Sequence, residues 1–287
     1  MKQIVVISGK GGTGKTVVTA SLAALAGKKV MADCDVDAAD LHILLSPEIK
    51  ERHTFKSGKT AVIDMSKCAR CGLCLSSCRF EAIKPGPSVD AVSCEGCAFC
   101  SFICPAEAIT MEENDTGEWY ISETRFGPMV HAKLGIAEEN SGKLVSLVRN
   151  KAKELAEEMG LDWVIIDGSP GIGCPVIASI SGVDTALVVT EPTMSGLHDA
   201  DRVIKVTRYF NVPVKLVINK FDLNENFSGK IELYCKENNV PILGKIPFDK
   251  DVVKAMVDKR SVVEFSDGPA SLEIRRIWRS LEDENLP

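Results

Sequence analysis

The chain has 287 residues, enough to bury a sizeable core in one large domain or two smaller ones. Its 40 acidic residues outnumber its 34 Lys and Arg residues, for a net charge of −6 without a long basic block, so no nucleic-acid partner is expected. No apolar stretch approaches a spanning helix and the N-terminus does not resemble a signal peptide, so we expect a cytoplasmic protein that binds no membrane. Eleven cysteines in that reducing compartment indicate metal ligands or buried thiols.

The first predicted element is a buried strand, residues 4–7, that leads directly into a glycine-rich loop and then a helix over residues 17–26. The loop has the G-x-x-x-x-G-K-T pattern over Gly9, Lys10, Gly11, Gly12, Thr13, Gly14, Lys15 and Thr16. Its backbone N–H groups can turn inward onto phosphates, Lys15 can reach the β- and γ-phosphates, and Thr16 can bind Mg²⁺. The positive end of the following helix favours the same anion. The stretch therefore predicts a nucleotide site with Mg²⁺.

A second predicted strand, residues 29–32, ends in an acidic tip that contains Asp33, Asp35 and Asp37. Beyond residue 57 the composition changes, because eight cysteines fall in two runs of the form C-x₂-C-x₂-C-x₃-C, the second 26 residues after the first. The runs are Cys68, Cys71, Cys74 and Cys78, then Cys94, Cys97, Cys100 and Cys104. Such a repeat indicates two copies of one small unit.

This segment resembles a two-cluster bacterial ferredoxin, in which the fourth cysteine of each run binds the cluster of the other run. The resemblance implies two [4Fe–4S] clusters, one on Cys68, Cys71, Cys74 and Cys104 and one on Cys94, Cys97, Cys100 and Cys78. The proline that usually follows the fourth cysteine is present as Pro105 and replaced by Arg79 after Cys78. Zinc on paired C-x₂-C motifs is the alternative, but the spacing of the third and fourth cysteines favours iron and sulfur.

After the cysteine segment, short apolar strands again alternate with helices, with strands predicted over residues 163–166, 185–189 and 214–218. This alternation predicts a three-layer α/β fold of the P-loop NTPase type with a mostly parallel sheet. Because the cysteine segment interrupts the alternation, we expect a discontinuous P-loop domain, residues 1–57 and 115–287. A small α+β ferredoxin-like domain is inserted at residues 58–114.

The second lysine of the loop, Lys10, indicates which class of P-loop protein this is. The sequence K-G-G-x-G-K-T over residues 10–16 resembles the deviant Walker A motif of the MinD-like ATPases, which include chromosome-partitioning, iron–sulfur carrier and nitrogenase iron proteins. The resemblance implies that Lys10 reaches across a nucleotide-dependent homodimer to the other subunit's phosphates. It also implies that Asp35, with Asp33 and Asp37 as alternatives, orients the attacking water. Asp167, which follows the strand at residues 163–166, would hold Mg²⁺, through water.

The base-reading residues are less tightly defined by the sequence. Asn219 ends a predicted strand and begins N-K-x-D, a pattern of guanine-reading GTPases. In MinD-like ATPases an Asn at this strand end contacts adenine instead, through an amide that can both donate and accept. The stretch from residue 246 to 249, with Pro247, resembles the loop that lines the adenine pocket in that family. With Lys10 present, we expect ATP rather than GTP.

Together these features predict a Mg²⁺-dependent ATPase whose dimer switch is coupled to electron transfer, through the two clusters, to an unknown redox partner protein. One alternative is an iron–sulfur cluster assembly or carrier ATPase, and the other is a ParA/MinD-type positioning ATPase with redox sensing. A C-terminal helix is predicted with Ile274, Ile277, Trp278 and Leu281 on one face. Acidic residues follow it, so we expect this helix to dock on the core and not on an anionic membrane.

Overall fold

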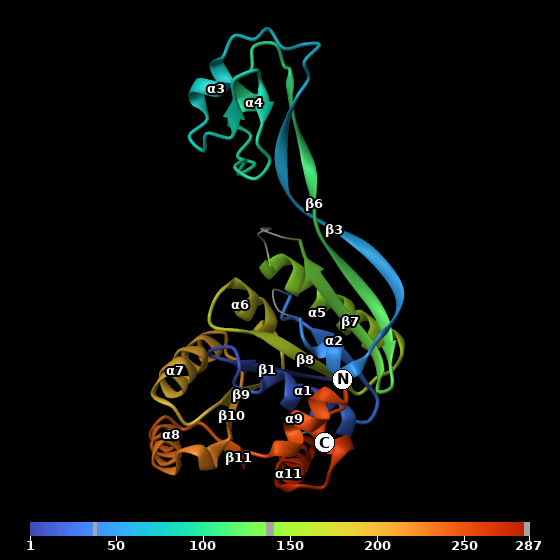
Figure 1. Cartoon of the computed structure of the whole chain (residues 1–287), viewed down its shortest axis with the longest axis vertical. Helices are drawn as coiled ribbons and strands as arrows, with labels where there is room; N and C mark the ends of the chain where they lie inside the picture. Colours follow the sequence, from blue (N-terminus) through green and yellow to red (C-terminus); the bar gives the residue numbers. More distant parts are fainter. Residues whose placement is uncertain (37–38, 136–140, 284–287) are drawn as a thin grey trace. The chain divides into compact units, whose positions relative to one another are not determined.

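The computed structural model describes residues 1–36, 39–135 and 141–283, which form two compact units (Figure 1). The larger unit contains Met1–His53, Trp119–Lys133 and the chain from Ser141 onward. The smaller unit contains Thr54–Glu118 and a short stretch that begins at Leu134. The predicted insert, residues 58–114, lies within the smaller unit.

In the first half of the chain, the strands and helices run in the following order. They are β1 (Lys2–Ser8), α1 (Lys15–Leu25), β2 (Lys29–Asp33), α2 (Leu41–Leu45), β3 (Glu48–Ile63), α3 (Leu73–Ser77), β4 (Ile83–Lys84), β5 (Ser88–Val89), α4 (Phe99–Ile103), β6 (Ile109–Thr124) and β7 (Gly127–Leu134). The long strands β3 and β6 were not expected from the sequence, because neither contains a long apolar run, and most side chains of β3 are exposed.

In the second half, helices and strands alternate as predicted. The elements are α5 (Ser141–Glu158), β8 (Trp163–Pro170), α6 (Cys174–Ile180), β9 (Thr185–Thr190), α7 (Met194–Tyr209), β10 (Val214–Asn219), the 3₁₀ turn η1 (Phe221–Leu223), α8 (Glu225–Glu237), β11 (Ile242–Ile246), α9 (Lys250–Val257), α10 (Val262–Phe265) and α11 (Pro269–Asp283). All five strands predicted from apolar runs are present, as β1, β2, β8, β9 and β10.

One sheet contains nine strands in the order β11-β10-β9-β1-β8-β2-β7-β6-β3. Each pairing from β11 to β7 is parallel, so the predicted mostly parallel α/β sheet is confirmed. The register places Asp33 of β2 directly beside Asp167 of β8. Because parallel strands end at the same edge of a sheet, the loop after β1 and the acidic ends of β2 and β8 meet there.

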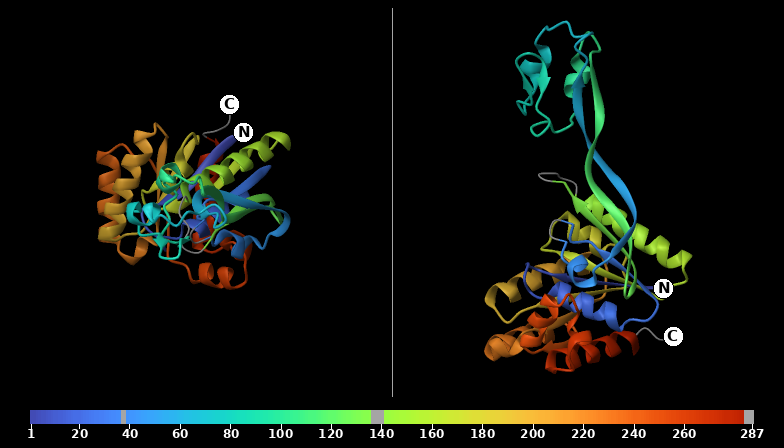
Figure 2. Two further views of the ribbon diagram at one scale, coloured as in Figure 1. Left: turned by 90° about the horizontal axis from the view of Figure 1, so that it is seen from above. Right: turned by 45° about the vertical axis from the view of Figure 1, so that its right-hand side comes forward.

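Helices flank the strands of the larger unit in two layers (Figures 1 and 2). Helices α1, α10 and α11 pack together on one side, while α5, α6 and α7 pack on the other. Helix α11 buries the predicted apolar face, with Trp278 packed edge-to-face on Trp163 at 5.1 Å between ring centroids. The expected docking of this helix is therefore confirmed. Within the described ranges, no helix is both long and apolar enough to cross a membrane.

The smaller unit contains the two cysteine runs, and their local structures repeat. Helices α3 and α4 pack against each other, and each follows a residue in the left-handed conformation, Gly72 (φ 76°) and Ala98 (φ 62°). The buried pairs Ala82-Ile83 and Ala108-Ile109 occupy equivalent places after the two runs. The repeat seen in the sequence therefore corresponds to two copies of the same local fold.

Candidate functional site

The loop between β1 and α1 has the geometry of a phosphate cradle. Gly14 has φ of 92°, and a Cβ at this position would collide with the amide of Asn219, so only glycine fits here. A Cβ on Gly9 would likewise strike Asp199, whereas Gly11 and Gly12 face open space. The glycines thus serve two purposes, because some allow close packing and others leave room beside the backbone.

Lys15 lies at the centre of a buried charge cluster below the loop. Its side chain is only 6% exposed, and Nζ lies 2.9 Å from Asp167 Oδ1 and 3.2 Å from Asp35 Oδ2. Burial alone would lower the pKa of Lys15, but the carboxylates of Asp167 and Asp35 outweigh it and raise the pKa to about 12. Thr16 and Thr19 also donate hydrogen bonds to Asp167, each at 2.9 Å. The predicted Mg²⁺ residues Thr16 and Asp167 are therefore in direct contact.

Asp33, which the sequence analysis considered only as an alternative to Asp35, also belongs to this cluster. Its side chain is fully buried, one carboxylate oxygen has no hydrogen-bond partner, and the other accepts a bond from the Asp35 N–H at 3.2 Å. Burial, reinforced by the nearby Asp167, raises the pKa of Asp33 well above its usual value. Asp35 instead lines the open cavity described next, which suits a water-orienting residue better. Asp37, the other alternative, lies outside the described residues.

A cavity of about 480 Å³ opens beside the loop. Eight of the predicted site residues line it: Gly11, Gly12, Gly14, Lys15, Thr16, Asp35, Asn219 and Pro247. Phe248, Val252, Val253 and Met256 supply an apolar wall that the sequence reasoning did not identify as a set. An apolar wall opposite a polar loop is suited to a ligand with a flat ring at one end and charged groups at the other.

Asn219, the last residue of β10, links this strand to the glycine-rich loop by a hydrogen bond. Its Nδ2 donates a hydrogen bond to the Thr13 carbonyl at 2.7 Å, and its Oδ1 accepts one from the Lys220 N–H at 3.0 Å. Thr13 is itself buried, and its hydroxyl has no hydrogen-bond partner. Asn219 therefore positions the loop in addition to lining the cavity.

Lys10 points to its own subunit in this structure. Its Nζ lies 2.6 Å from a carboxylate oxygen of Glu191 and donates a hydrogen bond to Ser195 Oγ at 3.0 Å. Glu191 is also 3.8 Å from Lys220 Nζ. Sequence reasoning gave Glu191 no role, although its position directly after the end of β9 is the signal that could have pointed to it.

Comparison with known proteins agrees with this geometry. The sequence pattern of the family described as "CobQ/CobB/MinD/ParA nucleotide binding domain" matches residues 4–262. The chain belongs to this family. The expected MinD/ParA-like P-loop class is therefore confirmed, whereas the roles of single residues stay predictions.

Relatives resemble the chain over nearly its whole length. An uncharacterized protein of Methanocaldococcus jannaschii is 35% identical, and the alignment covers 98% of this chain and 96% of the relative. An iron-sulfur cluster carrier protein of the same organism is 25% identical, with 97% and 83% covered. The septum site-determining protein MinD of Pyrococcus horikoshii OT3, solved in complex with Mg-ADP, superimposes with a TM-score of 0.62 at 18% identity, covering 99% and 96%. This last likeness shows a shared fold.

The cysteine runs, which lie in the smaller unit of this family member, line two cavities. One cavity, of about 460 Å³, is lined by Cys68, Cys71, Cys74 and Cys104. The other, of about 320 Å³, is lined by Cys78, Cys94, Cys97 and Cys100, together with Cys74 from the first set. We name these the A cavity and the B cavity. Each thus contains a complete set of four predicted ligands, three from one run and the fourth from the other.

Backbone N–H groups donate hydrogen bonds to the fourth cysteine of each run. Burial would raise the pKa of Cys78, but hydrogen bonds from the N–H groups of residues 80–83 outweigh it and lower this pKa. The equivalent Cys104 accepts a hydrogen bond from the Ala108 N–H at 3.4 Å. Donors aimed at sulfur favour the thiolate, which is the form that binds metal.

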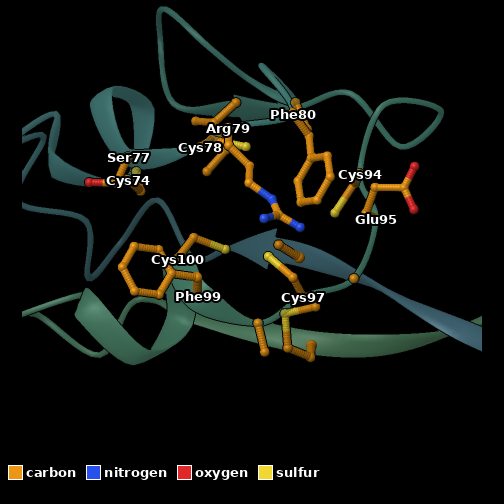
Figure 3. Close-up of a pocket in the computed structure, with 16 residues that line it drawn as sticks. Cys74, Ser77, Cys78, Arg79, Phe80, Cys94, Glu95, Cys97, Phe99 and Cys100 are labelled. Carbon is orange, nitrogen blue, oxygen red and sulfur yellow. The ribbon is translucent and has the colours of Figure 1, made fainter.

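The described residues contain no set of three His, Cys, Asp or Glu side chains close enough to hold a single metal ion. A tetrahedral zinc site needs its sulfurs about 2.3 Å from one point. Ligands of an iron–sulfur cubane instead surround a body several ångströms across, so they line a cavity and do not meet at a point. In Figure 3 the sulfurs of Cys97 and Cys100 are directed into the B cavity, toward the guanidinium of Arg79.

Proposed function

We propose that the protein is a Mg²⁺-dependent ATPase that works as a nucleotide-dependent homodimer and controls electron transfer through two [4Fe–4S] clusters to a redox partner protein. The observation that carries this proposal is the presence, in one chain, of the Lys15–Asp167–Thr16 cluster under a phosphate cradle and of two cavities that each contain one predicted set of four cysteines. Membership of the MinD/ParA family supports the ATPase part, and the cysteine spacing supports the clusters.

Nucleotide binding would rearrange the buried charge cluster. The Lys15 ammonium, now held by Asp167 and Asp35, would turn to the β- and γ-phosphates. Asp35 would then accept a hydrogen bond from the attacking water, and Thr16 and Asp167 would hold Mg²⁺. When bound, Mg²⁺ neutralises charge on the phosphates. Hydrolysis would depend on alignment by these side chains.

The Lys10–Glu191 ion pair suggests how dimerisation is controlled. In one subunit alone, Glu191 holds the Lys10 ammonium at 2.6 Å. In a nucleotide-bound dimer, Lys10 would leave Glu191 for the other subunit's phosphates. Lys10→Ala should then abolish ATP-induced dimerisation in light-scattering chromatography, while ATP still binds the single subunit. A Lys10→Ala variant that dimerises like wild type would remove this part of the proposal.

Adenine specificity is tested separately. Asn219, Pro247 and Phe248 line the cavity, and Asn219 supplies both a donor and an acceptor for a base edge. Competition of unlabelled ATP and GTP against a fluorescent nucleotide should favour ATP. Tighter binding of GTP would instead assign the N-K-x-D sequence at residues 219–222 to guanine.

The redox part is tested by metal analysis and EPR of anaerobically purified protein. We expect about eight iron atoms and eight sulfides per chain and, after reduction, the interacting signals of two [4Fe–4S] clusters. Zinc without an EPR signal would rule out the clusters. Coupling is tested by the cluster potentials with and without Mg-ATP, and unchanged potentials together with unchanged electron-transfer rates would rule out coupling.

Cluster delivery is the second candidate function. It is favoured by the similarity to an iron-sulfur cluster carrier protein and by the exposure of Cys71 and Cys97 at the surface of the smaller unit. An iron-loaded sample mixed with an apo-acceptor protein would lose iron to the acceptor if the clusters are cargo. Retention of all iron after repeated incubation would favour electron transfer.

A further inference from the structure

The two halves of the cysteine unit share a fold but differ in charge. Equivalent positions lie 26 residues apart, and between Cys68 and Lys84 there are four positions at which one half carries a charge that the other lacks. These pairs are Ala69 and Glu95, Arg70 and Gly96, Arg79 and Pro105, and Lys84 and Thr110. Because the two halves have the same local fold, these pairs differ in side-chain charge at equivalent positions of the backbone.

The charges are unevenly divided between the two cavities. The described residues that line the A cavity include Arg70 and Lys84 but no acidic side chain. Those that line the B cavity include one cation, Arg79, and one anion, Glu95. The formal charge of the lining, leaving out the cysteines, is therefore +2 for the A cavity and zero for the B cavity.

Arg79 does not reverse this difference. Arg79 lines the B cavity together with Cys97 and Cys100, and its guanidinium lies 4.7 Å from the Phe80 ring centroid. Glu95 lines the same cavity, so a charge at its centre would meet one cation and one anion, whose effects on that charge largely cancel.

Arg70 occupies a backbone position that favours glycine. It has φ of 52°, in the left-handed region, and its counterpart Gly96 has φ of 62°. A side chain at such a φ is disfavoured, and glycine is the usual residue there. The A half therefore retains a cation at a position where the B half has the residue that its backbone prefers. Replacement of Arg70 by glycine therefore suits the backbone of the A half.

Resting on the proposed function, we infer that the cluster in the A cavity has the higher reduction potential and accepts the electron from the cluster in the B cavity. Reduction adds one negative charge to a cluster, and nearby positive charge stabilises that state. The step moves one electron, with one cluster oxidised as the other is reduced, and no bond is made or broken. The electron must come from a low-potential one-electron donor that meets the B side, and leave to an acceptor that meets the A side.

The test is an EPR-monitored redox titration of the full chain and of two variants that copy the opposite half. Arg70→Gly removes the A-side cation and suits the left-handed backbone, so the loop should fold. Glu95→Ala removes the B-side anion and gives the residue found at position 69. We expect wild type to reduce in two steps. Arg70→Gly should lower the upper potential and Glu95→Ala should raise the lower one, each by up to about tenfold in the redox equilibrium, or about 59 mV.

Arg79→Pro is the control of opposite sign. It removes a cation from the B side, so the two potentials should move further apart. The backbone accepts proline there, because Cys78 has ψ of 102° and Cys104, which precedes Pro105, has ψ of 110°.

Three results would overturn the inference while leaving the proposed function in place. They are a single reduction step in wild type, an unchanged separation in both charge variants, and a shift of the lower potential by Arg70→Gly. Protein without iron after anaerobic purification would overturn the proposed function and this inference together.

Discussion

Replacement of Lys15 by Met tests the buried charge cluster beneath the phosphate cradle. Methionine keeps most of the volume of the lysine stem but removes the ammonium. Asp167, whose side chain is fully buried, and Asp35 then lose the cation that lies 2.9 and 3.2 Å away. We therefore expect Lys15→Met to lower the free energy of unfolding even when no nucleotide is bound.

The size of the loss follows from the same contacts. A pKa raised from 10.5 to about 12 corresponds to roughly 2 kcal/mol of stabilisation of the charged form. Removal of one partner from a buried ion pair costs about 3–5 kcal/mol, because the remaining carboxylates stay buried without a compensating positive charge. Since 1 kcal/mol shifts the melting temperature of a large domain by roughly 2–4 °C, we expect Tm to fall by about 10 °C.

Thermal unfolding followed by circular dichroism measures the loss, and Lys10→Met is the matched control. The Lys10 side chain is 31% exposed and its pair with Glu191 is partly solvated, so we expect that variant to lose less than about 1 kcal/mol. Folded Lys15 binds its proton more tightly than the unfolded chain does. The stabilisation is therefore complete below pH 10.5 and is lost as the pH rises through about 12. Equal melting temperatures for the two variants at pH 7 would refute the reasoning.

Three further outcomes are expected. Asn219→Ala removes the 2.7 Å bond to Thr13 and should lower the free energy of unfolding by about 1 kcal/mol in urea titrations, and no change would show that the bond contributes nothing. Thr16→Ala should abolish the gain in ATP affinity on adding Mg²⁺, measured by calorimetry, and a retained gain would exclude Thr16 as a ligand. His131 is buried, which lowers its pKa from 6.5 to about 4. Between these values the unfolded chain binds more protons, so stability should fall by roughly 3 kcal/mol as the pH drops from 6.5 to 4. His131→Gln should flatten that profile, and a profile as steep as wild type would assign it to other groups.

The sequence predicted the parts of the fold that local patterns encode. The strands at β1, β2, β8, β9 and β10 are continuous apolar runs, which is typical of a parallel sheet covered on both faces. The extra strands β3 and β6 alternate polar residues with few apolar ones, so their membership of the sheet depends on pairing that no local pattern reveals.

For the candidate sites too, local patterns were predictable from the sequence and contacts between distant segments were not. The spacing of the loop residues and of the cysteines predicted both candidate sites, because each set of residues is close in the chain. Contacts between distant segments were missed, including the ion pair of Lys10 with Glu191 and the burial of Asp33 beside Asp167. The left-handed conformation of Arg70 could not be predicted from its own neighbours in the sequence. The only indication is the glycine, Gly96, at the equivalent position of the second run.

The adjacency of β3 and β6 in the sheet has a consequence for what the connection between them can hold. One strand ends at Ile63 and its neighbour begins at Ile109, so the whole cysteine unit occupies the place of a hairpin turn. Lengthening a surface connection costs little, because the entropy of loop closure grows only with the logarithm of its length. A connection between two paired strands can therefore accept a whole folded unit without redesign of the strands that flank it.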